Sequence, residues 1–216
     1  MRRTRVKVCC IATPEEAATA IAAGADALGL VGEMPSGPGT IDDVMARKIA
    51  RQVPPPIATF LLTSRTRGSD IVDHVQDIGT STVQIVNHID PGEYAAIVPG
   101  LPGTRLVQVI HVEDDTAIEL VEAYEPHVHA FLLDSGRPKA ARAELGGTGR
   151  AHDWTISRRI VERSGKPVFL AGGLNHRNVG EAIQTVRPFG VDLCSGVRTD
   201  GKLDVIKLHA FMQGVF

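Results

Sequence analysis

The sequence lacks several features that mark specialised classes of protein. Only 4% of its residues are aromatic and its formal net charge is −2, a balance that argues against a dedicated nucleic-acid-binding protein. No apolar run is long enough to span a bilayer. The basic start at residues 1–5 is followed by only a short apolar run, so we expect no secretory signal. These absences predict a protein that binds neither nucleic acid nor membrane.

Cysteine is also scarce. The three cysteines are Cys9, Cys10 and Cys194, an odd number with two adjacent, which is a poor framework for disulfide bonds. We therefore expect reduced thiols and a cytoplasmic location. The cysteines and histidines show no metal-ligand spacing such as Cys-x-x-Cys or His-x-x-x-His, so no metal site is expected.

What the chain does contain is a repeated strand-and-helix pattern. Its 216 residues are 43% hydrophobic and 22% charged, which is typical of a globular protein with a large core. We expect strands at residues 6–11, 25–31, 57–62, 82–86, 105–110, 128–133, 167–170 and 190–194. We expect helices at residues 14–23, 41–53, 69–78, 91–98, 114–124, 154–164, 175–186 and 203–212, with Thr13, Thr40 and Asn175 as caps.

Strand followed by helix thus recurs about eight times without a break in composition. The pattern predicts an α/β protein, a single (β/α)8 TIM barrel formed by residues 1–216 as one domain. A doubly wound open sheet is the alternative, but near-equal repeats favour closure. In a barrel the carboxyl ends of all strands meet on one face, where the active site lies.

Two potential proton carriers stand at such strand ends. Cys9 ends the first strand and Asp134 ends the sixth, and a thiolate and a carboxylic acid can accept and donate a proton without a metal. The alternatives are a small buried hydrophobic role for Cys9 and a cap or turn role for Asp134. Cys10 should point away from the lumen if it continues the strand. His111 and His152 could carry protons too, although structural roles are favoured for both.

Glycine-rich loops follow the late strands. Gly172-Gly173 comes after the seventh strand and Ser195-Gly196 after the eighth, while residues 146–149 add a third such loop. Glycine lets backbone N–H groups approach an anion closely, and barrel loops seven and eight commonly bind phosphate. One glycine pair alone could reflect tight packing, but neighbouring loops together predict a phosphate site.

Several segments together resemble the phosphoribosylanthranilate isomerase family of tryptophan biosynthesis. The resemblance covers nearly the whole chain, from Lys7 to Lys207. The segments that carry it are Lys7-Val8-Cys9-Cys10-Ile11-Ala12, Ala23-Gly24-Ala25-Asp26-Ala27-Leu28-Gly29, Leu132-Leu133-Asp134-Ser135, Gly146-Gly147-Thr148-Gly149, Asp153-Trp154, Leu170-Ala171-Gly172-Gly173-Leu174 and Cys194-Ser195-Gly196-Val197.

The resemblance implies an Amadori rearrangement of N-(5-phosphoribosyl)anthranilate to an aminodeoxyribulose phosphate. It assigns Asp134 as general acid and Cys9 as general base. The residues that it implies for the phosphate are Gly172, Gly173, Ser195 and Gly196, with Gly147 and Thr148 close by. It implies a small phosphorylated substrate and neither a metal nor an organic cofactor. The oligomeric state cannot be read from the sequence.

The early half of the chain departs from the family pattern. The family places an arginine near the anthranilate carboxylate in the loop after strand two, whereas residues 34–39 here contain none. Arg65, Arg137, Arg150 or Arg198 could replace that charge. Two alternatives therefore stay open: a related sugar-phosphate isomerase with a different aglycone, and a barrel that binds a phosphorylated metabolite without turnover.

Overall fold

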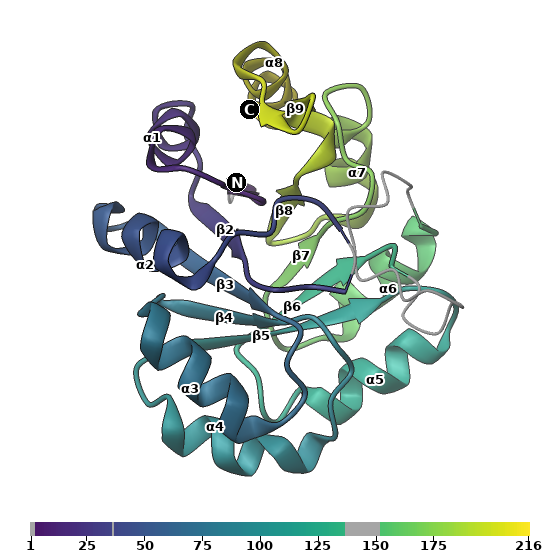
Figure 1. Cartoon of the computed structure of the whole chain (residues 1–216). Coiled ribbons are helices and arrows are strands. Elements are labelled where there is room, and N and C mark those ends of the chain that lie inside the picture. Colours follow the sequence, from purple (N-terminus) through teal and green to yellow (C-terminus); the bar gives the residue numbers. More distant parts are fainter. Residues whose placement is uncertain (1–2, 36, 137–151) are drawn as a thin grey trace.

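Eight parallel strands form the centre of the molecule. The computed structural model describes residues 3–35, 37–136 and 152–216 (Figure 1). Each strand pairs with the next along the chain and the last pairs with the first, so the sheet closes. The strands are β1 (Arg5–Val8), β2 (Ala27–Val31), β3 (Ala58–Thr63), β4 (Thr82–Ile85), β5 (Arg105–His111), β6 (Ala130–Asp134), β7 (Val168–Leu170) and β8 (Gly190–Leu193). The predicted (β/α)8 barrel is confirmed.

Helices surround the barrel on its outside (Figure 1). The α-helices are α1 (Pro14–Ala22), α2 (Asp43–Gln52), α3 (Gly68–Ile78), α4 (Tyr94–Gly100), α5 (Thr116–Tyr124), α6 (Trp154–Arg163), α7 (Val179–Val186) and α8 (Val205–Val215). The short elements are the 3-10 turns η1 (Pro91–Glu93) and η2 (Ser195–Val197), and the antiparallel strands β9 (Arg198–Thr199) and β10 (Lys202–Leu203). Among the described residues, no helix is long and apolar enough to cross a membrane.

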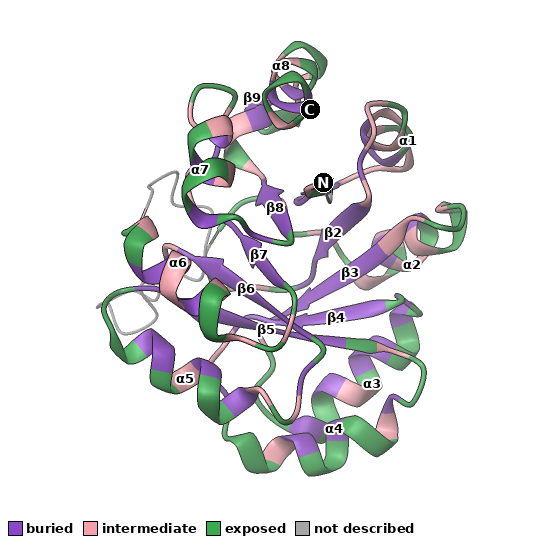
Figure 2. Cartoon of the chain, turned by 180° about the vertical axis from the view of Figure 1, so that it is seen from behind, coloured by how far each residue is buried: buried purple, intermediate pink, exposed green. Residues whose placement is uncertain are grey.

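The strands are buried on both faces, and the helices expose mainly their outward sides (Figure 2). Side chains alternate along each strand, so one set packs against the helices and the other fills the lumen. Apolar residues of the lumen set include Ala27, Phe60, Leu62, Val107, Val109, Ala130, Leu132 and Phe169. Burial on both faces explains why the strands read as nearly continuous apolar runs in the sequence.

Two of the three predicted helix caps are wrong. Thr13 caps α1 as predicted, because its side chain accepts a hydrogen bond from a backbone N–H of the first turn. The cap of α2 is Asp42, whereas Thr40 forms a β-bridge with Val31. Asn175 lies in a turn that precedes α7, where its Oδ1 accepts a hydrogen bond from Arg177 N at 2.9 Å. A turn, not a helix start, therefore follows the glycine loop after β7.

The barrel closes along the pairing of β1 with β8. Arg5 lies opposite Gly190 and Lys7 opposite Asp192 in this register. The two ends of the chain also meet near this seam, since the Arg3 guanidinium carbon lies 5.2 Å from the ring centroid of the C-terminal phenylalanine (Figure 1). The seam thus brings the beginning and the end of the sequence to one side of the barrel.

Candidate active site

A cavity opens where the strands end at their carboxyl termini. Its lining residues are Cys9, Cys10, Val31, Met34, Gly37, Pro38, Leu62, Gln84, Val86, Asp134, Ala171, Gly172, Gly173, Leu174, Asp192, Leu193, Cys194 and Ser195. The predicted site residues among them are Cys9, Asp134, Gly172, Gly173 and Ser195. Gly196 follows Ser195 in the chain but does not line the cavity, and Gly147 and Thr148 lie outside the described residues. The fold therefore brings five of the six described site residues to one cavity.

Cys9 follows β1 and reaches the cavity from the lumen side. Its side chain is only 5% exposed and its thiol is free. Gly29 on the neighbouring strand makes room for the sulfur, because a Cβ atom at that glycine would lie 2.7 Å from Cys9 Sγ. Burial raises the pKa of the Cys9 thiol to about 11, although the nearby Lys7 ammonium opposes this shift. Once ionised, a thiol with a raised pKa is a strong proton acceptor.

Asp134 ends β6, which is separated from β1 by β7 and β8. Its Oδ1 accepts a hydrogen bond of 2.7 Å from the backbone N–H of Ser135. Burial raises the pKa of the Asp134 carboxyl, and this effect outweighs the hydrogen bonds from Ser135 and the charge of Lys7. A raised pKa keeps the carboxyl protonated nearer to neutral pH, which suits a general acid.

A buried ion pair that the sequence analysis missed lies beside these groups. Lys7 Nζ is 2.9 Å from Asp192 Oδ1, and the exposed fractions of the two side chains are 0% and 9%. Burial of Asp192 raises the pKa of its carboxyl, while the Lys7 charge lowers it. Strand alternation could have revealed the buried position of Lys7 from the sequence. Lys7 stands two positions before Cys9, so both side chains are expected on the same face of the strand.

The two glycine loops approach their neighbours closely. Gly172 and Gly173 have φ angles of +88° and +65°, a region that favours glycine. A Cβ atom on Gly172 would lie 2.9 Å from Ser135 Oγ. A Cβ atom on Gly196 would lie 2.1 Å from the carbonyl oxygen of Leu174, so the loops after β7 and β8 touch at this point. Bare backbone of this kind can approach an anion closely.

Both candidate histidines are held in the neutral form by burial. His111 Nε2 lies 3.0 Å from the carbonyl oxygen of Val86, and burial lowers the pKa of this imidazole. His152 Nε2 lies 2.6 Å from Ser157 Oγ, and burial lowers its pKa to about 4. Neither histidine lines the cavity. These contacts agree with the structural roles favoured from the sequence.

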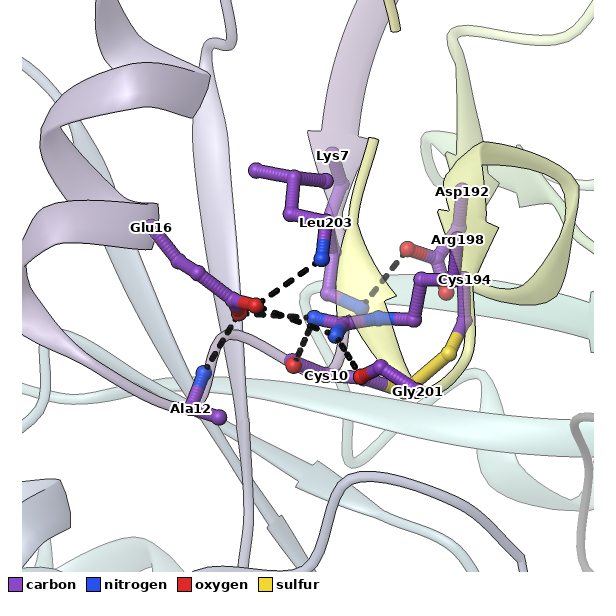
Figure 3. The surroundings of a disulfide bond; sticks show 9 residues. All are labelled: Lys7, Cys10, Ala12, Glu16, Asp192, Cys194, Arg198, Gly201 and Leu203. Atoms are coloured by element: carbon purple, nitrogen blue, oxygen red, sulfur yellow. Dashed lines mark hydrogen bonds and ion pairs between the residues drawn. A yellow bond between two sulfur atoms is a disulfide. The ribbon is translucent and has the colours of Figure 1, made fainter. Parts of the chain in front are cut away.

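A disulfide bond joins the first and last loops of this face (Figure 3). It links Cys10 and Cys194, whose Cα atoms are 5.9 Å apart although 184 residues separate them in the sequence. The expectation of unpaired cysteines is therefore wrong, and so is the expected outward direction of Cys10, which lines the cavity. Cys10 lies beyond the end of β1 and has a φ of +63°, so the alternation of the strand does not extend to it.

Arg198 reinforces the same corner (Figure 3). Its Nη2 lies 2.9 Å from Glu16 Oε2, and its guanidinium donates hydrogen bonds to the carbonyl oxygens of Cys10 and Gly201. Burial alone would raise the pKa of Glu16, but the hydrogen bonds from Arg198 and from backbone N–H groups lower it overall. The ion pair thus ties α1 and the loop after β1 to the segment after β8.

The opposite wall of the cavity is apolar. Its side chains are Val31, Met34, Leu62 and Val86. The loop after β2 ends at Gly39, which has a φ of +77° and packs against Cys10. A Cβ atom on Gly39 would lie 2.4 Å from the Cβ atom of Cys10, so no side chain fits there. The corner formed by Cys10 therefore excludes an arginine at this position of the loop.

None of the described arginines among the four candidates lines the cavity. Arg198 is engaged by Glu16, and the Arg65 guanidinium donates a hydrogen bond of 2.9 Å to the carbonyl oxygen of Asp70. Arg137 and Arg150 lie outside the described residues.

Gln84 was not assigned a role from the sequence, although it lines the cavity. Its side chain is 3% exposed and its Oε1 has no hydrogen-bond partner among the described residues. A buried amide oxygen without a partner is unfavourable by about 1–3 kcal/mol. It therefore offers an acceptor for a hydroxyl or N–H group of a bound molecule.

The closed barrel and the cavity at the carboxyl ends of its strands define a (β/α)8-barrel enzyme. The sequence profile of the N-(5'phosphoribosyl)anthranilate (PRA) isomerase family matches residues 6–214. The chain belongs to this family and is an isomerase, as its resemblance predicted.

Individual relatives support this assignment. The chain is 38% identical over 213 residues to the N-(5'-phosphoribosyl)anthranilate isomerase of Methanocella arvoryzae, covering 98% of each chain. It is 37% identical to N-(5'-phosphoribosyl)anthranilate isomerase 2 of Methanosarcina mazei, covering 97% of this chain and 92% of the relative.

Solved structures give the same result for the fold. Phosphoribosyl anthranilate isomerase from Thermotoga maritima superposes with a TM-score of 0.84 at 28% identity, covering 98% of both chains. Another phosphoribosyl anthranilate isomerase, solved with reduced 1-(o-carboxyphenylamino)-1-deoxyribulose 5-phosphate, superposes with a TM-score of 0.81 at 26% identity over the same share of both chains.

Proposed function

We propose that the chain rearranges N-(5-phosphoribosyl)anthranilate with Asp134 as general acid and Cys9 as general base. The observation that carries this proposal is that a buried thiol and a buried carboxyl line one cavity next to two glycine loops. The proposal treats residues 1–216 as one barrel domain and uses neither a metal nor an organic cofactor.

The first step opens the ribose ring. The carboxyl proton of Asp134 moves to the ring oxygen, and the bond from C1′ to that oxygen breaks with its electron pair on the oxygen. The anilino nitrogen supplies the electron pair of the new C1′=N bond. Burial favours this step, because it raises the pKa of Asp134 and so keeps a proton available for donation.

The second step moves a proton from carbon to sulfur. The Cys9 thiolate removes the proton from C2′, the C–H electron pair forms the C1′=C2′ bond, and the C=N pair returns to nitrogen. The resulting enol then tautomerises to the 2-ketone. During the two steps one negative charge disappears from the Cys9 sulfur and one appears on the Asp134 carboxylate.

Each end of the substrate has a proposed partner. The residues proposed to hold the phosphate are Gly172, Gly173, Ser195 and Gly196, with Gly147 and Thr148 close by. The last two belong to this site on the family resemblance alone. The aromatic ring would lie against the apolar wall, and the unpartnered Gln84 Oε1 would accept a hydrogen bond from a substrate hydroxyl or N–H.

Turnover of freshly prepared N-(5-phosphoribosyl)anthranilate, followed by fluorescence, tests the proposal. We expect the native protein to consume this substrate and the Asp134→Asn variant to lose that ability. A folded native protein that leaves the substrate unchanged, while it converts another phosphoribosyl amine, would contradict the assigned substrate.

The loop after β2 favours a second candidate substrate. Residues 34–39 contain no arginine that could meet an aryl carboxylate. A phosphoribosyl amine without the carboxylate would suit the apolar wall. Equal or higher kcat/KM for such a compound would favour this alternative, whereas a strong preference for the anthranilate would exclude it.

A further inference from the structure

The barrel lumen holds a complete ion pair that the two proposed steps do not use. Lys7 and Asp192 face each other across the seam between β1 and β8, with Nζ 2.9 Å from Oδ1. The Lys7 ammonium also lies 5.3 Å from the ring centroid of Phe60. An ammonium group paired with a carboxylate is therefore held inside the lumen next to the cavity.

Stability of the fold is a weak explanation for this pair. Removing two charges from water costs several kcal/mol per ion, and apolar residues of similar volume are often equally or more stabilising. The surrounding lumen is otherwise filled mainly by apolar side chains such as Phe60 and Val107. A pair that adds little stability in such a place is better explained by an effect on its neighbours.

Lys7 is placed to act on both proton carriers. A Cβ atom built on Gly29 would lie 3.1 Å from Lys7 Nζ and 2.7 Å from Cys9 Sγ, so both atoms lie close to this glycine. The β2 neighbour of Cys9 is thus an uncharged glycine, while the charged groups that act on its thiol are Lys7 on β1 and Asp192 on β8. Lys7 also acts on Asp134 across the lumen. Burial raises the pKa of the Cys9 thiol and of the Asp134 carboxyl, and the Lys7 charge lowers the pKa of each group in the opposite direction.

We propose that Lys7, held in place by Asp192, is a positioning residue that keeps one positive charge beside the negative charge as it passes from Cys9 to Asp134. This inference rests on the acid–base roles proposed above. Cys9 loses its charge by taking the C2′ proton, and Asp134 gains one by giving its own proton. The total charge of the site stays constant, so one fixed ammonium can balance it without proton exchange with water.

The test is the alkylation of Cys9 by iodoacetamide, because only the thiolate reacts. Cys10 and Cys194 are blocked by their disulfide, so the reaction reports on one sulfur. The key variant is Lys7→Met combined with Asp192→Asn, which removes both charges and leaves neither unpaired in the lumen. Rates are measured by mass spectrometry between about pH 7 and 9.5, around the usual thiol pKa.

We expect slower alkylation of the double variant at a given pH, because the Lys7 charge lowers the pKa of the Cys9 thiol more than the Asp192 charge raises it. A net rise of about one pKa unit would slow the reaction about tenfold. The kcat of the double variant should fall by at least a similar factor with little change in KM. Unchanged alkylation in the folded double variant would overturn the proposal. Slower alkylation with a normal kcat would overturn it as well.

A matched control removes a second ion pair of the described residues on this face. Glu16→Gln combined with Arg198→Met deletes a pair that contacts the Cys10 carbonyl and not Cys9. Alkylation of this control should stay within about twofold of the native rate, well below a shift of one pKa unit. Equal slowing in both double variants would reveal general loosening and would overturn the specific role of Lys7.

Two further variants distinguish a failure of the inference about Lys7 from a failure of the proposed function. If the double variant does not fold, Lys7→Met alone removes the ammonium that lowers the pKa of Cys9, so alkylation should become slower, and an equal or faster rate overturns the proposal. A Cys9→Ser variant with normal kcat would instead overturn the proposed function. The alkylation rates need no substrate and would still report on the contact between Lys7 and Cys9.

Discussion

The two walls of the cavity have opposite characters. The wall built from β6, β7, β8 and β1 carries the thiol, the carboxyls and the bare backbone of the glycine loops, and the buried Lys7 ammonium contacts the carboxyl of Asp192 in this wall. The wall built from β2, β3 and β4 presents aliphatic side chains and one amide. Among the described lining residues, the ionisable side chains are therefore confined to one half of the mouth.

This division suggests that chemistry and substrate choice are carried by different walls. The polar wall coincides with the segments that most closely match the family pattern, and the apolar wall with the segments that depart from it. A change in the apolar wall can alter the group attached to C1′ without disturbing proton transfer. Four experiments can break or sharpen this comparison.

The largest effect is expected on the polar wall, at the proton carriers. Cys9→Ser and Asp134→Asn should each lower kcat by roughly 10²–10⁴-fold with little change in KM, because proton transfer occurs only on the way to the transition state. Steady-state kinetics with N-(5-phosphoribosyl)anthranilate measures both constants. If both variants kept a near-normal kcat, the proton carriers would have to be sought elsewhere.

The next effect concerns the cross-linked corner. Cys10→Ser should lower the free energy of unfolding by about 2–4 kcal/mol under non-reducing conditions, because the disulfide restricts a very long loop of the unfolded chain. Denaturant unfolding measures this difference. The native protein with dithiothreitol is the matched control and should resemble the variant. A reductant that left the native midpoint unchanged would contradict the role of the bond.

A smaller effect is expected at the contact between the glycine loops. Gly196→Ala should raise KM about 10- to 100-fold, because its Cβ atom would collide with the Leu174 carbonyl and disturb a charge-assisted hydrogen bond worth about 1.5–3 kcal/mol. Gly180→Ala is the control, since the nearest atom to a Cβ there is 3.6 Å away. Similar KM values for both variants would remove Gly196 from the phosphate site.

The smallest effect is expected on the apolar wall. Met34→Ala should raise KM about three- to tenfold by removing part of the apolar surface that covers the aglycone, with kcat nearly unchanged. The comparison with Cys9→Ser is informative, because the substitution in the polar wall should change kcat and the substitution in the apolar wall should change KM. A large loss of kcat in Met34→Ala would show that the walls are not independent.

The order of the elements could be read from the sequence because each strand is a short apolar run followed by a helix with its own start signal. Element ends were harder to predict. Thr40 and Asp42 are both good cap residues, and only the bridge between Thr40 and Val31 in the folded chain decides which one caps α2. Local sequence does not contain that contact.

The positions of Cys9 and Asp134 at the cavity were predictable, because each stands at the end of a strand. The site was not predictable where distant segments meet. The disulfide partner of Cys10 lies 184 residues away, and the pairing of Lys7 with Asp192 depends on the closure of the barrel. Arg198 was a candidate for the substrate because its buried partner, Glu16, is equally remote in sequence.

The disulfide also makes the chain almost a covalent ring. A single backbone cut at any point between Cys10 and Cys194 would leave two fragments that sulfur still holds together. Arg3, near the start of the sequence, contacts Phe216 at its end. A short linker could therefore join them, and new termini could be opened in an exposed loop elsewhere, giving a circular permutant whose cross-linked corner is intact.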